Sequence, residues 1–260
     1  MRIVAVQLNM AWEDKAANHD RVRELLSNAA VPPGSLIIVP EMFETGFSMK
    51  LEAAAQTEDR AGEALLRELA IQYESAMMGG VAAPVENGTS KNECVVFGPD
   101  GNELVRYQKM QPFSHSGEDK YYPAGAAHCL FEWQGVRIAP FICYDLRFPE
   151  IFRAAVMDGA ELITLIACWP QKRSEHWVRL LQARAIENLA PVVGVNRCGR
   201  EPGLDFDGRS AAFDHMGQPL FEATADEQVL MVEFDMQAAR DWRGHFPALR
   251  DISHVPQTSS

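Results

Sequence analysis

The stretch VRIAPFICYDLRFPE, residues 136–150, joins an apolar run, a single thiol and the start of a helix. Residues 136–142 are apolar at almost every position, which is typical of a strand that is buried on both faces. Pro149 and Glu150 suit the first turn of a following helix. Cys143 stands at the junction, where it is either a small buried side chain or a nucleophile presented by the end of a strand.

Helix-like and strand-like patterns alternate outward from this stretch. Helical periodicity covers residues 15–30, 60–74, 149–158 and 174–190, and Ser174 suits the N-cap of the last of these. Strand-like runs cover residues 2–8, 35–40, 76–83, 93–98, 128–133, 136–142, 161–167, 191–196, 210–214 and 228–234. This alternation indicates an α/β fold in which helices cover the sheet. Region 86–134 holds several strands and no clear helical pattern, which predicts a mixed sheet.

No proline- or glycine-rich linker divides the chain, so we expect a single domain over residues 1–260. Its last ten residues, DISHVPQTSS, resemble a loosely held tail that begins at about residue 250. The pair Asn87-Gly88 predicts a tight turn between two strands.

Composition narrows the classes of partner. The 260 residues carry a formal net charge of −12, and so acidic a surface repels nucleic acid. No apolar stretch approaches the roughly 18 residues that a membrane span needs, and the first residues do not resemble a targeting signal. The five cysteines are widely spaced and form no CxxC, so we expect reduced thiols in a cytoplasmic protein, without disulfides or a thiolate metal site.

Reactive side chains follow the ends of buried strands. Glu41 follows residues 35–40, and Cys143 and Cys168 each follow an apolar run. Lys109 follows another strand-like segment. Ligands of open α/β sheets bind at the carboxyl ends of strands. A thiol nucleophile needs a base, and the oxyanion that it creates needs a cation or backbone donors. A carboxylate, a lysine and a cysteine could supply these functions without histidine or metal.

Three segments carry a family resemblance. PEMFETGF (40–47), YQKMQPF (107–113) and ICYDLRFPE (142–150) resemble, in order, the active-site motifs of the nitrilase superfamily of carbon–nitrogen hydrolases. Residues 183–199 and 206–220 resemble later parts of the family, so the likeness covers nearly the whole chain. It implies a four-layer α-β-β-α sandwich, a homodimer or higher homo-oligomer, and neither a metal nor an organic cofactor.

The resemblance also implies roles for single residues. Glu41 resembles the general base and Cys143 the nucleophile, while Lys109 and the backbone N–H of Tyr144 resemble the oxyanion hole. Glu118, in SGEDKYYPAG, resembles a second glutamate beside the lysine, although this segment departs from the family pattern. The implied reaction is cysteine-dependent release of ammonia from a small amide through a thioester.

The surroundings of the motifs suggest a pocket. We expect Cys168 and Trp169 to line it. Arg173 and His176 either face the pocket and bind a substrate carboxylate or lie on the surface. Asp145 and Arg147 are interpreted instead as a structural pair that holds the turn after Cys143.

Within the superfamily, the motifs are most similar to the ω-amidase branch, which hydrolyses amides of 2-oxo acids such as 2-oxoglutaramate. A carboxylate in the substrate would favour a cation in the pocket, supplied by Arg173 or Arg197. A nitrilase, an aliphatic amidase or an N-carbamoyl amino acid hydrolase would use the same Glu–Lys–Cys set. A thiol acyltransferase and a non-catalytic binding scaffold are more distant alternatives.

Overall fold

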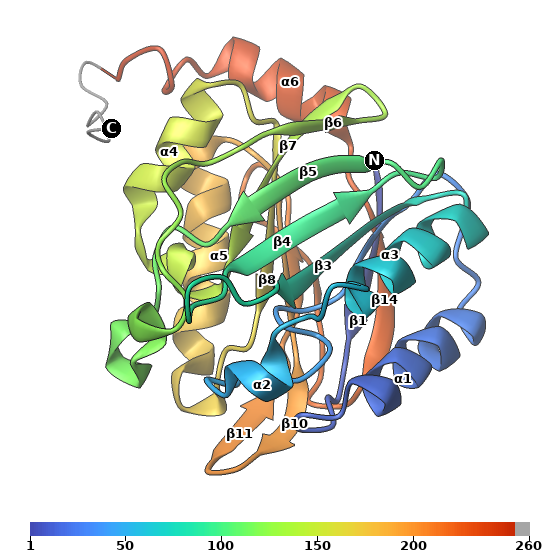
Figure 1. Ribbon diagram of the computed structural model, residues 1–260. Coiled ribbons are helices and arrows are strands. Elements are labelled where there is room, and N and C mark those ends of the chain that lie inside the picture. The colour runs from blue at the N-terminus through green and yellow to red at the C-terminus, as the bar shows by residue number, and fades with distance from the viewer. Residues whose placement is uncertain (253–260) are drawn as a thin grey trace.

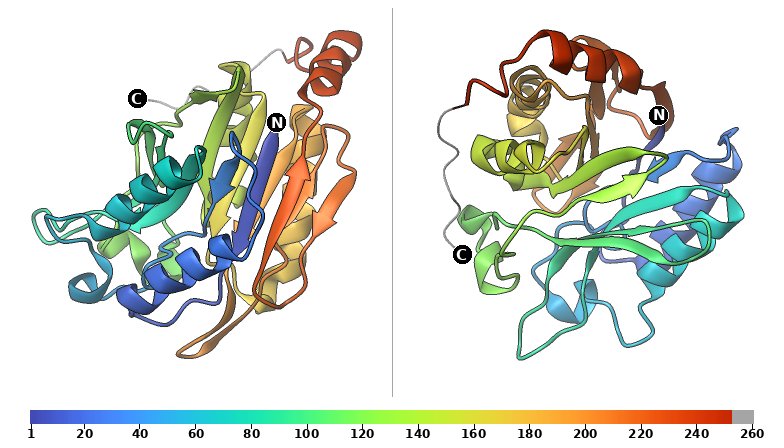
Figure 2. Two further views of the ribbon diagram at one scale, coloured as in Figure 1. Left: turned by 90° about the vertical axis from the view of Figure 1, so that its right-hand side faces the viewer. Right: turned by 90° about the horizontal axis from the view of Figure 1, so that it is seen from above.

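The strand-like runs form two six-stranded sheets that lie face to face (Figures 1 and 2). The structure is a computed structural model that describes residues 1–252, so most of the expected tail, residues 253–260, lies outside the described residues. The first sheet has the order β14-β1-β2-β3-β4-β5, formed by Gln228–Glu233, Arg2–Gln7, Leu36–Ile38, Ala76–Ala82, Asn92–Phe97 and Glu103–Gln108. The second has the order β13-β12-β9-β8-β7-β6, formed by Pro219–Glu222, Ala211–Phe213, Val192–Asn196, Leu162–Ala167, Val136–Ile142 and Phe131–Trp133.

Both sheets are mixed, as expected. The neighbours β1, β2 and β3 are parallel, and so are β7, β8 and β9. Antiparallel strands flank each set. Two antiparallel steps separate β5 from β3, so β5 runs in the same direction as β3, while β4 runs in the opposite direction. The carboxyl ends of β2, β3 and β5 and the first residue of β4 therefore share one edge of the first sheet.

Helices cover the outer faces of both sheets. Helices α1 (Lys15–Ser27) and α3 (Ala61–Gln72) lie on the first sheet, while α4 (Pro149–Met157) and α5 (Ser174–Asn188) lie on the second (Figures 1 and 2). The predicted four-layer α-β-β-α sandwich is therefore confirmed. Within residues 1–252, no helix is both long and apolar enough to cross a membrane.

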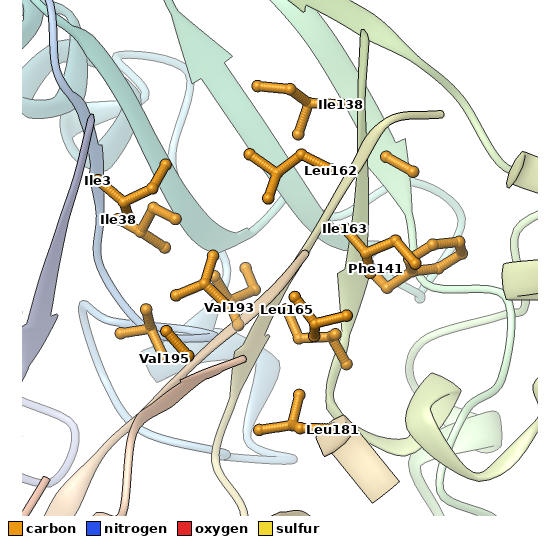
Figure 3. Packing of buried hydrophobic residues seen from close by; sticks show 14 of the residues in the cluster. Ile3, Ile38, Ile138, Phe141, Leu162, Ile163, Leu165, Leu181, Val193 and Val195 are labelled. Atoms are coloured by element: carbon orange, nitrogen blue, oxygen red, sulfur yellow. The ribbon is translucent and has the colours of Figure 1, made fainter. Parts of the chain in front are cut away.

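The continuous apolar runs follow from burial on both faces of each sheet. Ile3 and Ile38 point into the space between the sheets, toward Val193 and Val195 of β9 (Figure 3). Their neighbours on the other face, such as Val4, belong to a second apolar cluster beneath α1 and α3. Because side chains alternate between the faces of a strand, a strand between two apolar layers has no solvent-facing position.

The structure differs from two local predictions and confirms a third. Residues 128–133 form a strand only over Phe131–Trp133. Ser174 is the first residue of α5, and the N-cap is Arg173, which makes no side-chain capping bond. The turn at Asn87-Gly88 is confirmed, with φ angles of 51° and 81°.

Other elements were not predicted. They are the short helix α2 (Leu51–Ala54), the C-terminal helix α6 (Met236–His245) and the two-stranded ribbon of β10 (Cys198–Glu201) and β11 (Leu204–Asp207).

The packing between the sheets predicts the stability of core variants. Leu162 of β8 is fully buried and pairs in register with Ile138, whereas Leu220 of β13 is 43% exposed. Leu162→Ala should lower the free energy of unfolding by about 2–5 kcal/mol, because it leaves a cavity between two layers. Leu220→Ala, the matched control, should change it by about 0.5 kcal/mol or less. Urea unfolding measures both, and equal losses would contradict this description of the core.

Candidate active site

The structure brings Glu41, Lys109 and Cys143 to one place, where the edges of the two sheets meet. Glu41 follows β2 and Lys109 follows β5 of the first sheet, while Cys143 follows β7 of the second. The backbone of β3 passes very close to the backbone of Glu41. A Cβ at Gly80 of β3 would lie only 2.6 Å from the Cα of Glu41. A residue without a side chain is needed at position 80 for Glu41 to sit where it does.

Lys109 is a buried cation between two buried carboxylates. Its Nζ lies 2.9 Å from Oε1 of Glu41 and 3.0 Å from each carboxylate oxygen of Glu118. Glu118 lies in a short 3₁₀ helix (Glu118–Lys120) and also accepts a hydrogen bond from the backbone N–H of Phe113. The segment that departs from the family pattern thus places its glutamate beside the lysine.

The electrostatics keep Lys109 charged. Burial by itself lowers the pKa of Lys109, but the carboxylates of Glu118 and Glu41 outweigh that effect and hold the pKa well above its usual range. An ammonium that does not lose its proton cannot act as a base. It remains a fixed hydrogen-bond donor and a fixed positive charge.

The thiol of Cys143 stays protonated unless a neighbouring base accepts its proton. Burial raises its pKa well above the ordinary value, and the negative charge of Glu41 adds to this, while Lys109 acts in the opposite direction. The arrangement therefore places a proton acceptor beside a thiol that needs one.

The backbone at Cys143 is strained. Cys143 has a φ of 47°, in the left-handed region that non-glycine residues seldom adopt. It opens a 3₁₀ helix (Cys143–Arg147), and the N–H groups at the start of a helix lack acceptors within it. The amide of Tyr144, the second residue of this helix, follows directly after the sulfur-bearing residue.

Asp145 holds this turn in place. Its Oδ2 accepts hydrogen bonds from the N–H of Ile142 (2.9 Å) and the hydroxyl of Tyr107 (2.7 Å), and its Oδ1 accepts one from the N–H of Gln111 (2.9 Å). Tyr107 and Gln111 flank Lys109 in sequence, so the carboxylate ties the two motif segments together. The expected pair of Asp145 with Arg147 is wrong, because the hydrogen bonds of this carboxylate come from Ile142, Tyr107 and Gln111 and none comes from Arg147.

A pocket opens above Cys143. Its walls are largely apolar, and they include Phe47, Phe113, Tyr144, Cys168, Trp169, Pro170, Leu204 and Phe206. Arg147 and Arg173 also line it. The guanidinium of Arg147 lies 4.8 Å from the ring of Trp169, and that of Arg173 lies 5.3 Å from the ring of Phe113. Neither forms an ion pair with a carboxylate of residues 1–252, and the charge of Arg173 is one cause of the lowered pKa of Arg147, after burial.

His176 and Arg197, which were also predicted to contact the substrate, do not line the pocket. The Nδ1 of His176 lies 3.2 Å from Nη2 of Arg147. Arg197 is fully buried, forms an ion pair with Glu201 at 2.7 Å and stacks on Phe206 at 4.3 Å. The suggestion that Arg197 supplies a free cation is therefore wrong.

Asn92 and Arg147 contribute to the site but were not predicted to do so. Asn92 donates hydrogen bonds to Glu41 at 2.8 Å and to Glu118 at 2.9 Å. Arg147, which was predicted to pair with Asp145, lines the pocket instead. No signal in the sequence distinguishes Asn92 from other strand asparagines, whereas the position of Arg147 four residues after Cys143, one turn of a helix away, is a usable hint.

Comparison with known proteins identifies relatives of this chain. The sequence model of the carbon–nitrogen hydrolase family matches residues 2–244. The chain is 35% identical to the ω-amidase YafV of Escherichia coli K12, over 96% of each chain, and 32% identical to a 2-oxoglutaramate amidase of Bacillus subtilis, over 84% of each chain.

Two solved structures are also similar. A CN-hydrolase superfamily protein of Xanthomonas campestris, which carries an arsenic adduct in its active site, is 36% identical with a TM-score of 0.90, covering 98% of this chain and 97% of that one. A mutant amidase of Nesterenkonia, with acrylamide added at its active-site cysteine, is 27% identical with a TM-score of 0.82, covering 95% and 98%. With the family match extending over most of its length, the chain belongs to the carbon–nitrogen hydrolase family.

Proposed function

We propose that the protein hydrolyses the ω-amide of a small 2-oxo acid, such as 2-oxoglutaramate, and releases ammonia through a thioester on Cys143. The observation that carries the proposal is the buried cluster of Glu41, Lys109 and Glu118 beside a protonated thiol at the base of a pocket. The names of the similar ω-amidase and 2-oxoglutaramate amidase support the choice of substrate.

The first half of the proposed reaction forms the acyl-enzyme. Glu41 accepts the proton of Cys143 as the sulfur attacks the amide carbon, and the carbonyl electron pair moves onto oxygen. The ammonium of Lys109, held between Glu41 and Glu118, supplies a fixed positive charge and a hydrogen-bond donor to the oxyanion. The N–H of Tyr144 supplies a second donor. When the oxyanion collapses, the C–N bond breaks and Glu41 gives its proton to the departing ammonia.

The second half releases the acid. Glu41 takes a proton from a water molecule, whose oxygen attacks the thioester carbon. The same donors hold the second oxyanion. Its collapse breaks the C–S bond, the proton returns from Glu41 to the sulfur, and the new carboxylic acid ionises as it leaves. Each residue ends the cycle in its starting state.

The pocket favours an amide that also carries a carboxylate. Arg147 and Arg173 are two cations in a largely apolar pocket, and neither pairs with a carboxylate of residues 1–252. A guanidinium binds a carboxylate through two parallel hydrogen bonds. A simple nitrile or aliphatic amide offers a carboxylate to neither guanidinium, which is the specific reason for proposing an amide that carries one, such as that of a 2-oxo acid.

Three broader features also belong to the proposal. We infer one domain over residues 1–260, a cytoplasmic location and a homodimer or higher homo-oligomer. All five cysteines are free thiols, which is consistent with a reducing compartment. Light scattering after gel filtration measures the oligomeric state, and a monomer would contradict that part of the proposal.

Substitution of the reacting groups tests the mechanism. Cys143→Ala should abolish ammonia release from 2-oxoglutaramate, because it removes the sulfur that forms the thioester. Glu41→Gln keeps the size of the side chain but removes the base, and should lower turnover by about 10²–10⁴-fold. Ammonia production is measured with a coupled assay, and circular dichroism confirms that each variant is folded.

The control for these variants is Cys129→Ala, which removes a half-buried thiol outside the pocket. It should retain turnover within about twofold. Undiminished ammonia release by Cys143→Ala would overturn the mechanism. A substrate screen with nitriles, aliphatic amides and N-carbamoyl amino acids tests the substrate class, and added hydroxylamine reveals acyl transfer to an acceptor other than water.

The two arginines give a separate prediction. Arg147→Met and Arg173→Met should each lower kcat/KM for 2-oxoglutaramate by about 10- to 100-fold, as expected for hydrogen bonds to a charged group. The value for butyramide, which has no carboxylate, should fall much less. Arg179→Met, at a 73% exposed position on α5, is the control. Equal losses on both substrates would show that the arginines do not recognise a carboxylate.

A further inference from the structure

Asn92 lies in the middle of the catalytic carboxylates although it belongs to none of the three motifs. It is the first residue of β4, which runs opposite to β3 and β5, and so it stands at the same sheet edge as Glu41 and Lys109. Its side chain is buried, with only 1% of the residue exposed. Its Nδ2 lies 2.8 Å from Oε1 of Glu41 and 2.9 Å from Oε1 of Glu118.

The chemistry of its neighbours determines the orientation of this amide. Both partners are carboxylate oxygens, which accept hydrogen bonds and cannot donate them when ionised. The atom between them must therefore be the amide nitrogen, whose two N–H groups serve one carboxylate each. Together with Lys109, Asn92 closes a ring of four side chains in which two donors alternate with two carboxylates.

The hydrogen bonds to Glu41 are unevenly distributed over its two oxygens. Oε1 accepts from both Asn92 and Lys109, while Oε2 accepts from the backbone N–H of Cys168 at 2.8 Å. A carboxylate offers about four lone-pair sites, two on each oxygen. Three are occupied, and the vacant one is on Oε2.

We propose that Asn92 is a positioning residue that saturates Oε1 of Glu41 and so directs the thiol proton to Oε2. The inference rests on the proposed role of Glu41 as the base. Without Asn92, the carboxylate has a second vacant site, on Oε1, and proton transfer loses its fixed direction. The neutral donor also separates the charges of Glu41 and Glu118 without adding a second cation.

Removal of the donor has a signature that loss of packing alone does not produce. Asn92→Ala should lower kcat/KM by about 10- to 100-fold, because a hydrogen bond to a charged group is lost. It should also move the acid limb of the pH profile of kcat/KM to higher pH, since a carboxylate with fewer donors is less stable in its ionised form. Asn92→Asp keeps the shape but replaces the donor with an acceptor, and should lose at least as much activity.

The pH dependence must be assigned by comparison with the wild type, because other titratable groups surround Glu41. They are Lys109, Glu118, Tyr122, Cys143, Cys168 and Glu201. All of them are retained in Asn92→Ala. The rate of alkylation of Cys143 by iodoacetamide, followed by mass spectrometry against pH, gives a second profile that needs no substrate. Its acid limb should shift in the same direction.

Asn188→Ala is the matched control. Asn188 is also fully buried, lies on α5 outside the site, and, like Asn92, has an Oδ1 without a partner within residues 1–252. Both alanine variants should lose stability. Only Asn92→Ala should shift the acid limbs of the pH profiles of kcat/KM and of Cys143 alkylation. An unshifted alkylation profile in Asn92→Ala, or an equal shift in Asn188→Ala, would overturn the inference. If the wild type hydrolyses no amide, the proposed function fails, yet the alkylation profiles still decide the role of Asn92.

Discussion

The structure depends on a single buried ammonium. Taking the charge of Lys109 out of water is costly, and one carboxylate in a buried pair repays that cost only if its geometry is excellent. Here two carboxylates share the task, and each lies within 3.0 Å of the nitrogen. The adjoining thiol of Cys143 remains protonated because burial raises its pKa, and the negative charge of Glu41 raises it further. In the proposed reaction, Cys143 is therefore held in its protonated form and becomes a nucleophile only as its proton moves to Glu41.

This cluster explains why the two sheets must be held at a fixed spacing. Glu41 and Lys109 belong to one sheet and Cys143 to the other, so a small shift between the sheets would separate the base from the thiol. Two features oppose such a shift. Gly80 of β3 leaves room for the side chain of Ile166 from the second sheet, which would lie 2.8 Å from a Cβ at position 80. Asp145 binds the turn after Cys143 to both sides of Lys109. The apolar layer between the sheets supplies cohesion, while these polar contacts set the register at the edge where the chemistry takes place.

The sequence predicted the structure best where apolar residues do nothing but fill the core. Continuous apolar runs occur only in strands with both faces covered, so the central strands could be predicted, and the residues that follow them pointed to Glu41, Cys143 and Cys168. It was least informative where a side chain has several possible partners. Arg147 is two residues from Asp145, but the tight 3₁₀ turn directs the carboxylate toward Tyr107 and the guanidinium into the pocket. Asn92 is even less predictable, since its partners lie 51 and 26 residues away. Helix α6 was missed because only Met236 and Ala239 in it are buried, so it has few apolar residues that mark a packed helix.

The distribution of charge along the pocket gives the proposed reaction a direction. The base of the pocket, with two carboxylates and one ammonium, is negative, and the walls above it carry Arg147 and Arg173. A ligand with a neutral amide at one end and a carboxylate at the other therefore enters with the amide toward Cys143. Hydrolysis converts that amide into a carboxylate, which then lies next to Glu41 and Glu118 and is repelled by them. The carboxylate charge that adds to the effect of burial in keeping the thiol protonated thus also disfavours retention of the product.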